Sequence, residues 1–194
     1  MYNFDASGKE KEIGESSRLA DKLFENRSVF ICGEINQKLA REVIMQLVGM
    51  SADSDKDITV YLNSQGGHVE SGDTIHDMIK FVKPRVKMVG TGWVASAGTH
   101  IFLSVPKDDR VCLPNTRFLI HQPMGGVGGQ AADIKIEAQE IIKMRKRLNE
   151  IIAEQTGQPL KKVEQDTDRN FWMTAKEALE YGLVGKIISS IDEL

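Results

Sequence analysis

Three short segments of this 194-residue chain combine residues that can perform chemistry with glycines that allow sharp turns. The first runs from Asn63 to His68 and contains the consecutive glycines Gly66 and Gly67. Paired glycines let the backbone turn tightly and present bare N–H groups to a ligand oxygen. Taken alone, the segment is read more simply as a tight turn without a chemical role.

The second segment, Gly92 to Gly98, places a single hydroxyl, that of Ser96, among small residues. A strand that ends here and a helix that begins here would expose Ser96 as a nucleophile, with room for a carbonyl to approach. The spacing differs from the GxSxG elbow, because position 94 is valine. For a lone serine at such a position, helix capping is the alternative role.

The third segment, Phe118 to Gly126, is an apolar run that delivers His121 to its polar end. An imidazole can accept a proton from a hydroxyl near neutral pH, although a purely structural hydrogen bond is the alternative. The other histidines lack the cysteine or carboxylate spacing of a metal site, so no metal is predicted. Surface or core roles are expected for these three, His68, His76 and His100.

Short apolar runs alternate with longer segments of helical period, which predicts an α/β domain with its function at the strand ends. Strands are expected at residues 58–62, 86–89, 117–120 and 184–188. One helix should begin after Asn36, with an apolar face that includes Leu39, Val43, Ile44, Leu47 and Val48. A helix from Ala131 to Gln155 is long for a compact monomer. A capping box of Thr174 and Glu177 predicts the start of a last helix, which should end at Gly182.

Composition excludes several function classes. With 41% hydrophobic and 27% charged residues, the chain is expected to be one domain at 18–194 after a flexible segment at 1–17. A net charge of −3 argues against nucleic-acid binding. The lack of any stretch of eighteen apolar residues predicts no membrane span, and the polar first twenty residues, Met1 to Ala20, predict no signal peptide. Cys32 and Cys112 lie in apolar runs and are expected in the core.

The order of these motifs resembles the family of Clp protease proteolytic subunits. The Gly-Gly turn, Ala-Ser-Ala-Gly and Ile-His-Gln-Pro-Met-Gly-Gly are followed by Gly-Gln-Ala-Ala-Asp-Ile and Asp-Thr-Asp-Arg, and the likeness spans residues 17–188. The resemblance implies a crotonase-like α/β superhelix of β-β-α units, with a handle helix at about 125–155. It also implies two stacked heptameric rings around a closed chamber.

The same resemblance implies a cytoplasmic serine endopeptidase of protein quality control. Its substrates would be unfolded polypeptides delivered by an AAA+ unfoldase such as ClpX, ClpA or ClpC. No cofactor is expected, because the unfoldase rather than this chain uses ATP. Nucleic acid and membranes are not expected partners.

Roles follow for individual residues by the same resemblance. The catalytic residues would be Ser96 as nucleophile, His121 as base and Asn170 as third member, with an oxyanion hole from the N–H groups of Gly67 and Ala97. Other matched positions would bind substrate (His68, Gly125, Gly126), join the rings (Gln130, Asp168, Arg169) or dock the unfoldase (Tyr61, Phe81). A core role is the alternative for Tyr61 and Phe81.

Three positions depart from the family pattern. Asn170 stands where the family usually has aspartate, so it can orient an imidazole but supplies no charge. Gln65 replaces a proline, so the glycine turn is expected to need support, and Thr59 replaces an aromatic, so docking is expected to be weaker. These departures keep open a weakly active or structural subunit of a mixed ring with a second proteolytic subunit. A crotonase-type acyl-CoA enzyme is the third alternative, and Ser96 and His121 count against it.

Overall fold

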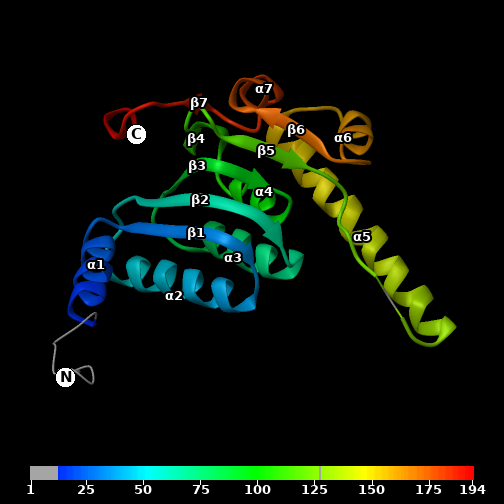
Figure 1. Cartoon of the computed structure of the whole chain (residues 1–194), viewed down its shortest axis with the longest axis horizontal. Helices are drawn as coiled ribbons and strands as arrows, with labels where there is room; N and C mark the ends of the chain where they lie inside the picture. The colour runs from blue at the N-terminus through cyan, green and yellow to red at the C-terminus, as the bar shows by residue number, and fades with distance from the viewer. Residues whose placement is uncertain (1–12, 127) are drawn as a thin grey trace, which may run out of the picture.

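A mostly parallel, seven-stranded sheet forms the centre of the computed structural model, which describes residues 13–126 and 128–194 (Figure 1). Its main path has the order β1-β2-β3-β4-β7, and β5 pairs with the second half of β3 and with the antiparallel β6. The strands are β1 (Ser28–Ile35), β2 (Ile58–Gly67), β3 (Val86–Ala95), β4 (Arg110–Cys112), β5 (Arg117–Ile120), β6 (Phe171–Thr174) and β7 (Lys186–Ile187).

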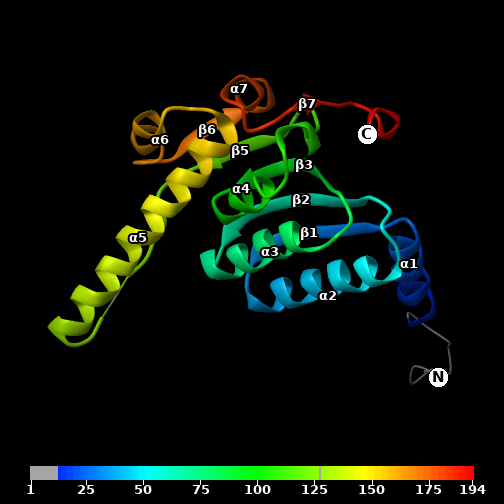
Figure 2. The ribbon, with the colours of Figure 1, turned by 180° about the vertical axis from the view of Figure 1, so that it is seen from behind.

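Helices lie between most of these strands in the chain and pack against the sheet. Helices α2, α3 and α4 pack side by side against it (Figures 1 and 2). The α-helices are α1 (Ile13–Glu25), α2 (Gln37–Asp53), α3 (Val69–Phe81), α4 (Ala97–Phe102), α5 (Ala131–Thr156), α6 (Leu160–Asp166) and α7 (Ala175–Tyr181). Short 3-10 turns occupy Lys107–Asp109 and Ile191–Glu193. The α/β prediction is confirmed.

Element boundaries differ from expectation mainly in length. Strands β2 and β3 continue five and six residues beyond the predicted ends, whereas the strand predicted at 184–188 is reduced to β7. Residues 13–17 belong to α1, and the rest of the predicted flexible segment lies outside the described residues. Within the described part of the chain, no helix is both long and apolar enough to cross a membrane.

Local signals explain where two of the helices begin and end. The Asn36 side chain accepts a hydrogen bond from the Leu39 N–H at 2.9 Å and starts α2. In α7, Thr174 and Glu177 form the predicted capping box, and Gly182 ends the helix in the left-handed conformation. The expected apolar face of α2 is partly wrong. Val48 is 49% exposed, and the buried positions are Ala40, Val43, Leu47 and Met50.

The two cysteines have different environments. Cys112 in β4 is buried, as predicted, but Cys32 in β1 is exposed, so its core assignment is wrong. Strand side chains alternate between the two faces of a sheet. In β1, Val29 and Ile31 point into the core, which leaves Cys32 on the outer face.

Helix α5 projects away from the body of the molecule (Figures 1 and 2). Only Asn149 and Ile152, near its C-terminal end, are buried. The outer part of the helix exposes several isoleucines, namely Ile134, Ile136 and Ile142. A helix of this length with uncovered apolar side chains is typical of an element that packs against another chain.

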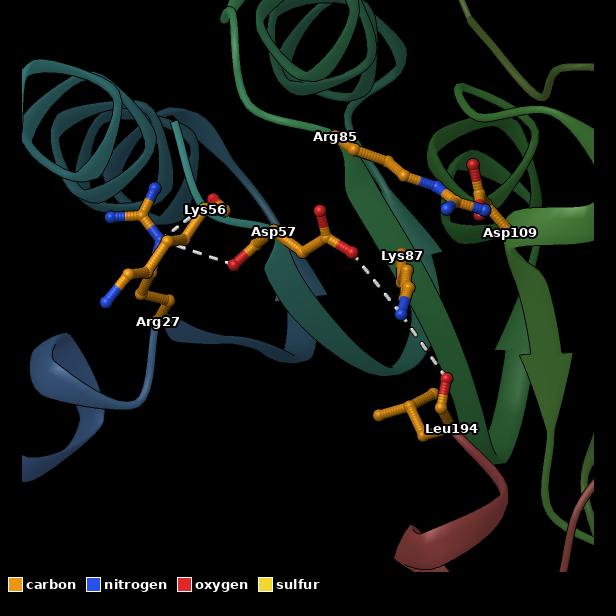
Figure 3. A network of polar contacts seen from close by, with 7 residues as sticks. All are labelled: Arg27, Lys56, Asp57, Arg85, Lys87, Asp109 and Leu194. Atoms are coloured by element: carbon orange, nitrogen blue, oxygen red, sulfur yellow. Dashed lines mark hydrogen bonds and ion pairs between the residues drawn. The ribbon is translucent and has the colours of Figure 1, made fainter. Parts of the chain in front are cut away.

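A polar network holds the strand starts at the edge opposite to the candidate site (Figure 3). The buried Arg27 guanidinium donates to the carbonyls of Lys56 and Asp57, at 3.0 and 3.2 Å. The Lys87 ammonium lies 3.3 Å from the Asp57 carboxylate and donates to the Leu194 backbone oxygen at 3.3 Å. These contacts fix the amino ends of β2 and β3, whereas the candidate site lies at the carboxyl ends of the same strands.

Candidate active site

Ser96 occupies a strained turn between β3 and α4. Its φ of 56° and ψ of −121° lie outside the regions that non-glycine residues usually adopt, a conformation that costs about 1–3 kcal/mol. The Ser96 N–H donates to the Leu119 carbonyl at 3.0 Å. The Thr99 hydroxyl lies within hydrogen-bond distance of the Val94 and Leu119 carbonyls, at 2.9 and 2.8 Å. Although Ser96 precedes α4, its side chain makes no capping hydrogen bond, so the capping interpretation is wrong.

The glycine pair lies directly against this turn. A Cβ atom on Gly66 would be 2.6 Å from the Ser96 Cβ and 2.8 Å from the Ala95 carbonyl oxygen, and its φ is +96°. A Cβ atom on Gly67 would collide with the Ile35 carbonyl, and its φ is +150°. Both positions therefore require glycine. A Cβ atom on Gly66 would also lie 3.2 Å from the Ala97 nitrogen, so the turn packs against the start of α4. The role of Gly67 and Ala97 as oxyanion donors stays a prediction.

Two side chains of β2, those of Ser64 and Gln65, hold the glycine turn in place. The Ser64 hydroxyl donates to the Gly33 carbonyl at 2.5 Å and accepts from the Gly66 N–H at 3.0 Å. With its amide oriented to satisfy both neighbours, Gln65 donates to the Gly33 carbonyl and accepts from the Glu34 N–H, each at 3.2 Å. Gln65 and Ser64 thus anchor the turn to the irregular part of β1.

His121 reaches the same edge of the sheet from the neighbouring strand. Strand β5 runs parallel to the end of β3, with Phe118 paired to Val94 and Leu119 paired to Ala95. The carboxyl ends of parallel strands meet at one edge, so Ser96 and His121 line one pocket. Its walls are mainly apolar and are formed by Val69, Ala97, Ile120, Pro123, Leu148 and Ile152.

The His121 imidazole is in the form that a general base needs. Burial lowers its pKa below the usual value of 6.5, so the neutral ring predominates at neutral pH. Its Nε2 atom is buried and has no hydrogen-bond partner among the residues that the structure describes. Ser96 and His121 therefore share a pocket in the single chain without the hydrogen bond that proton transfer requires.

Asn170 lies on the other side of His121. Both line an open recess with Gln122, Met124, Asp168 and Arg169. The Gln122 N–H donates to the Thr167 carbonyl at 2.6 Å, and its side-chain amide donates to the Asp168 carbonyl at 2.7 Å. These two bonds connect the residue after His121 to the turn that carries Asn170, so the structure brings the three predicted catalytic residues to one edge.

The predicted substrate-binding residues flank this edge on exposed segments. The His68 ring contacts the first turn of α3, with Nδ1 2.9 Å from the Ser71 hydroxyl and Nε2 3.1 Å from the Glu70 carboxylate. Gly125 and Gly126 lie in the exposed segment between β5 and α5. Their proposed contact with a peptide stays a prediction.

The predicted ring-contact residues lie at the surface, one directly before α5 and two beside the inner half of this helix. Gln130 is exposed directly before the helix. The Asp168 carboxylate lies 3.3 Å from the Arg145 guanidinium of α5 and 3.2 Å from that of Arg169. Asp168 is thus placed between an α5 cation and an exposed arginine, and its role between rings stays a prediction.

The predicted docking residues are both accessible. Tyr61 stacks on Phe30, with ring centroids 4.9 Å apart, and packs beside a small apolar cluster of Val89, Val111, Ile188 and Leu194. Phe81 is 80% exposed at the end of α3, so the alternative core role is wrong for Phe81. Tyr61 is half-buried.

Sequence reasoning missed a group of polar residues behind the pocket. His76 and His100 are both buried, and His100 lines the pocket with Ser96 and His121. Asp73 and His76 are three residues apart on α3, a spacing that places them on one helix face, but no local pattern connects them with His100.

Comparisons with known proteins agree with this geometry. The profile of the Clp protease family matches residues 9–191. The chain is 58% identical over 190 residues to the ATP-dependent Clp protease proteolytic subunit 3 of Rhizobium johnstonii, covering 98% of each protein. It is 61% identical over 180 residues to proteolytic subunit 2 of Gluconobacter oxydans, covering 92% of this chain and 81% of that one.

Two solved structures have the same fold. ClpP1 from Listeria monocytogenes is 55% identical, with a TM-score of 0.83 over 91% of this chain and 99% of that chain. An asparagine-to-aspartate mutant of the same protein is also 55% identical, with a TM-score of 0.85 over 90% and 98% of the two chains.

Proposed function

The chain belongs to the Clp protease family, and on this premise we propose that it is a serine endopeptidase with Ser96 as its nucleophile. The observation that carries the proposal is the strained turn of Ser96, which opens into a pocket shared with His121. Strained backbone of this kind persists where the surrounding structure holds it, and it is concentrated at active sites. The neutral state of His121 supports its role as the base.

The reaction proceeds in two halves. Ser96 Oγ attacks the peptide carbonyl carbon while His121 accepts the hydroxyl proton, and the resulting oxyanion binds the N–H groups of Gly67 and Ala97. Each such donor contributes about 3 kcal/mol to transition-state stabilisation. His121 then protonates the leaving amine, which leaves an acyl group on Ser96. Water hydrolyses this ester by the same proton transfers, so the cycle uses no cofactor.

Activity of the isolated subunit is expected to be low. The Asn170 oxygen can accept a hydrogen bond from the imidazole, but it offers no negative charge to the imidazolium. His121 Nε2 also lacks a partner within the described residues. These observations favour a second candidate, a weakly active or structural subunit of a mixed ring. Relatives named proteolytic subunit 2 and subunit 3 are consistent with such a division of labour.

Assembly into two stacked heptamers is part of the same proposal. The projecting α5 exposes Ile134, Ile136 and Ile142, and Asp168 lies near the inner part of this helix. Pairing of α5 between rings would cover these side chains. An AAA+ unfoldase would dock through Tyr61 and Phe81 and deliver unfolded polypeptides in the cytoplasm.

A fluorophosphonate probe tests the proposal, because only an activated serine reacts with it. We expect labelling of Ser96 in the assembled protein, and loss of labelling and peptide hydrolysis in Ser96→Ala with ring assembly unchanged. Ser104→Ala is the matched control, because this buried hydroxyl has no hydrogen-bond partner within the described residues and lies outside the pocket. Near-normal hydrolysis by Ser96→Ala would remove Ser96 from the mechanism. Intact rings that never label, alone or with a second subunit, would favour the structural role.

A further inference from the structure

A stacked pair of histidines lies buried behind the candidate active site. The rings of His76 on α3 and His100 on α4 are 4.3 Å apart and inclined by only 2°. His76 Nδ1 lies 2.9 Å from the His100 carbonyl oxygen. Their exposed fractions are 5% and 6%. Two adjacent imidazoliums would repel each other, and burial together with His100 lowers the pKa of His76 to about 4. His76 is therefore neutral at neutral pH.

Asp73 connects this pair to the inner end of α5. The Asp73 carboxylate accepts two hydrogen bonds from the Arg147 guanidinium, at 2.8 and 2.7 Å. The same carboxylate lies 2.8 Å from His100 Nε2, a close contact that lacks the direction of a hydrogen bond. Burial alone would raise the pKa of Asp73, but its contacts with His100 and Arg147 hold that pKa well below its usual range. Asp73 is therefore ionised at all pH values where the protein is assayed.

The cluster meets the nucleophile through α4. The His100 N–H donates to the Ser96 carbonyl at 3.2 Å, so His100 closes the first turn of the helix that begins beside Ser96. His100 lines the pocket, and so do Leu148 and Ile152 of α5. Arg147 directly precedes Leu148, so one short run of α5 both contacts Asp73 and forms part of the pocket.

We propose that Asp73 and His100 are positioning residues that couple α5, through Arg147, to the turn that carries Ser96. The inference deepens the proposed serine peptidase and rests on it. A bidentate arginine–carboxylate pair fixes both distance and orientation. A shift of about 1 Å in a reacting group can lower the rate about 100-fold, so a small movement of α4 is enough to uncouple Ser96 from His121. When α5 is held by another subunit, this link would fix the nucleophile turn as well.

The rate of fluorophosphonate labelling tests the coupling, because it reports on Ser96 without requiring peptide binding. We expect Asp73→Ala to lower both the labelling rate and kcat about 100-fold with little change in KM. Arg147→Lys keeps the charge but loses the paired hydrogen bonds, so it should fall between wild type and Arg147→Ala. The double variant Asp73→Ala/Arg147→Ala should be no slower than Asp73→Ala, because both substitutions break the same link.

Two controls keep the result specific. Glu42→Gln changes an exposed carboxylate on the neighbouring helix α2 and should leave labelling unchanged. Sedimentation velocity on the same samples shows whether the rings are intact. If Asp73→Ala does not fold, the labelling rates of Arg147→Lys and His100→Gln are measured in its place.

Three outcomes would overturn the inference. The first is a labelling rate equal to that of the wild type in every variant with intact rings. The second is a double variant whose loss of labelling rate equals the combined losses of the two single variants. The third is a change in KM alone, which would mean that His100 contacts the substrate and does not position Ser96. If intact wild-type rings do not label, either alone or with a second subunit, the proposed function itself fails, and the two failures are thereby distinguished.

Discussion

The two halves of the candidate active site are held very differently. The Ser96 turn is bounded by Gly66 of β2 and by the hydrogen bond to Leu119 of β5, both within the packed sheet. His121, in contrast, begins the irregular segment after β5, and its Nε2 has no partner in the part of the chain that the structure describes. The nucleophile half of the site, the Ser96 turn, is thus held in place by contacts within a single chain. We infer that the imidazole half is completed by assembly.

Gly66→Ala should disrupt the Ser96 turn, and we expect it to have the largest effect on activity. The new methyl group would be placed 2.6 Å from the Ser96 Cβ, so either the turn moves or β2 does. We expect kcat for peptide hydrolysis to fall about 100-fold or more, as for a misplaced reacting group. Gly49→Ala is the control, because its added Cβ meets only Phe24 at 3.6 Å. Unchanged turnover in Gly66→Ala would mean that the close packing at Ser96 has no catalytic role.

Asn170→Asp should improve the function of the imidazole half of the site, which contains His121. Aspartate has nearly the same size as asparagine and adds a negative charge that stabilises the imidazolium formed during acylation. The reverse substitution in a serine protease lowers turnover by roughly four orders of magnitude. We expect a gain of at least about tenfold in kcat, smaller than that figure because ring assembly can also limit the rate. Peptide hydrolysis and sedimentation should be measured on the same samples, and no gain within intact double rings would move the limiting step to the Gly66-Gly67 turn.

Asp168→Ala and Arg169→Ala test whether assembly completes the imidazole half. In the single chain these side chains are 51% and 83% exposed, so their pair contributes little to the stability of one subunit. Between rings, loss of one partner would leave the other charge desolvated. We expect a shift from double to single rings and a several-fold lower activity. Sedimentation velocity at low protein concentration is the measurement, with exposed Lys161→Ala as control. Double rings that persist in both variants would contradict the ring-contact role.

The pH dependence of peptide hydrolysis tests the environment of His121 and should show the smallest effect. Protonated His121 cannot accept the Ser96 proton, so activity should decline on the acid side as pH falls through the pKa of His121. Because burial lowers that pKa, the decline should lie below pH 6.5. In Asn170→Asp the nearby negative charge favours the imidazolium, so the acid limb should move to higher pH. Coincident profiles for the two proteins would show that residue 170 does not sense the imidazole.

Sequence alone determined the features that depend on neighbouring residues. The glycine pair, the small residues around Ser96 and the apolar run before His121 predicted a candidate site, and the structure places these segments at one edge of the sheet, because strand ends and turns have local signatures. The Asn36 cap, the Thr174 capping box and the length of α5 were confirmed for the same reason. The resemblance of the ordered motifs to one family was sufficient to predict the fold.

Only the tertiary structure decided features that depend on which elements meet. The strand face of Cys32, the exposure of Phe81 and the support that Gln65 gives to the glycine turn follow from packing between distant segments. The joining of His100 with Asp73 and Arg147 is of the same kind, since it brings three helices together. Periodicity specifies which face of an element is apolar, but the partner of a buried charge is set by the fold, because the two residues are far apart in the chain.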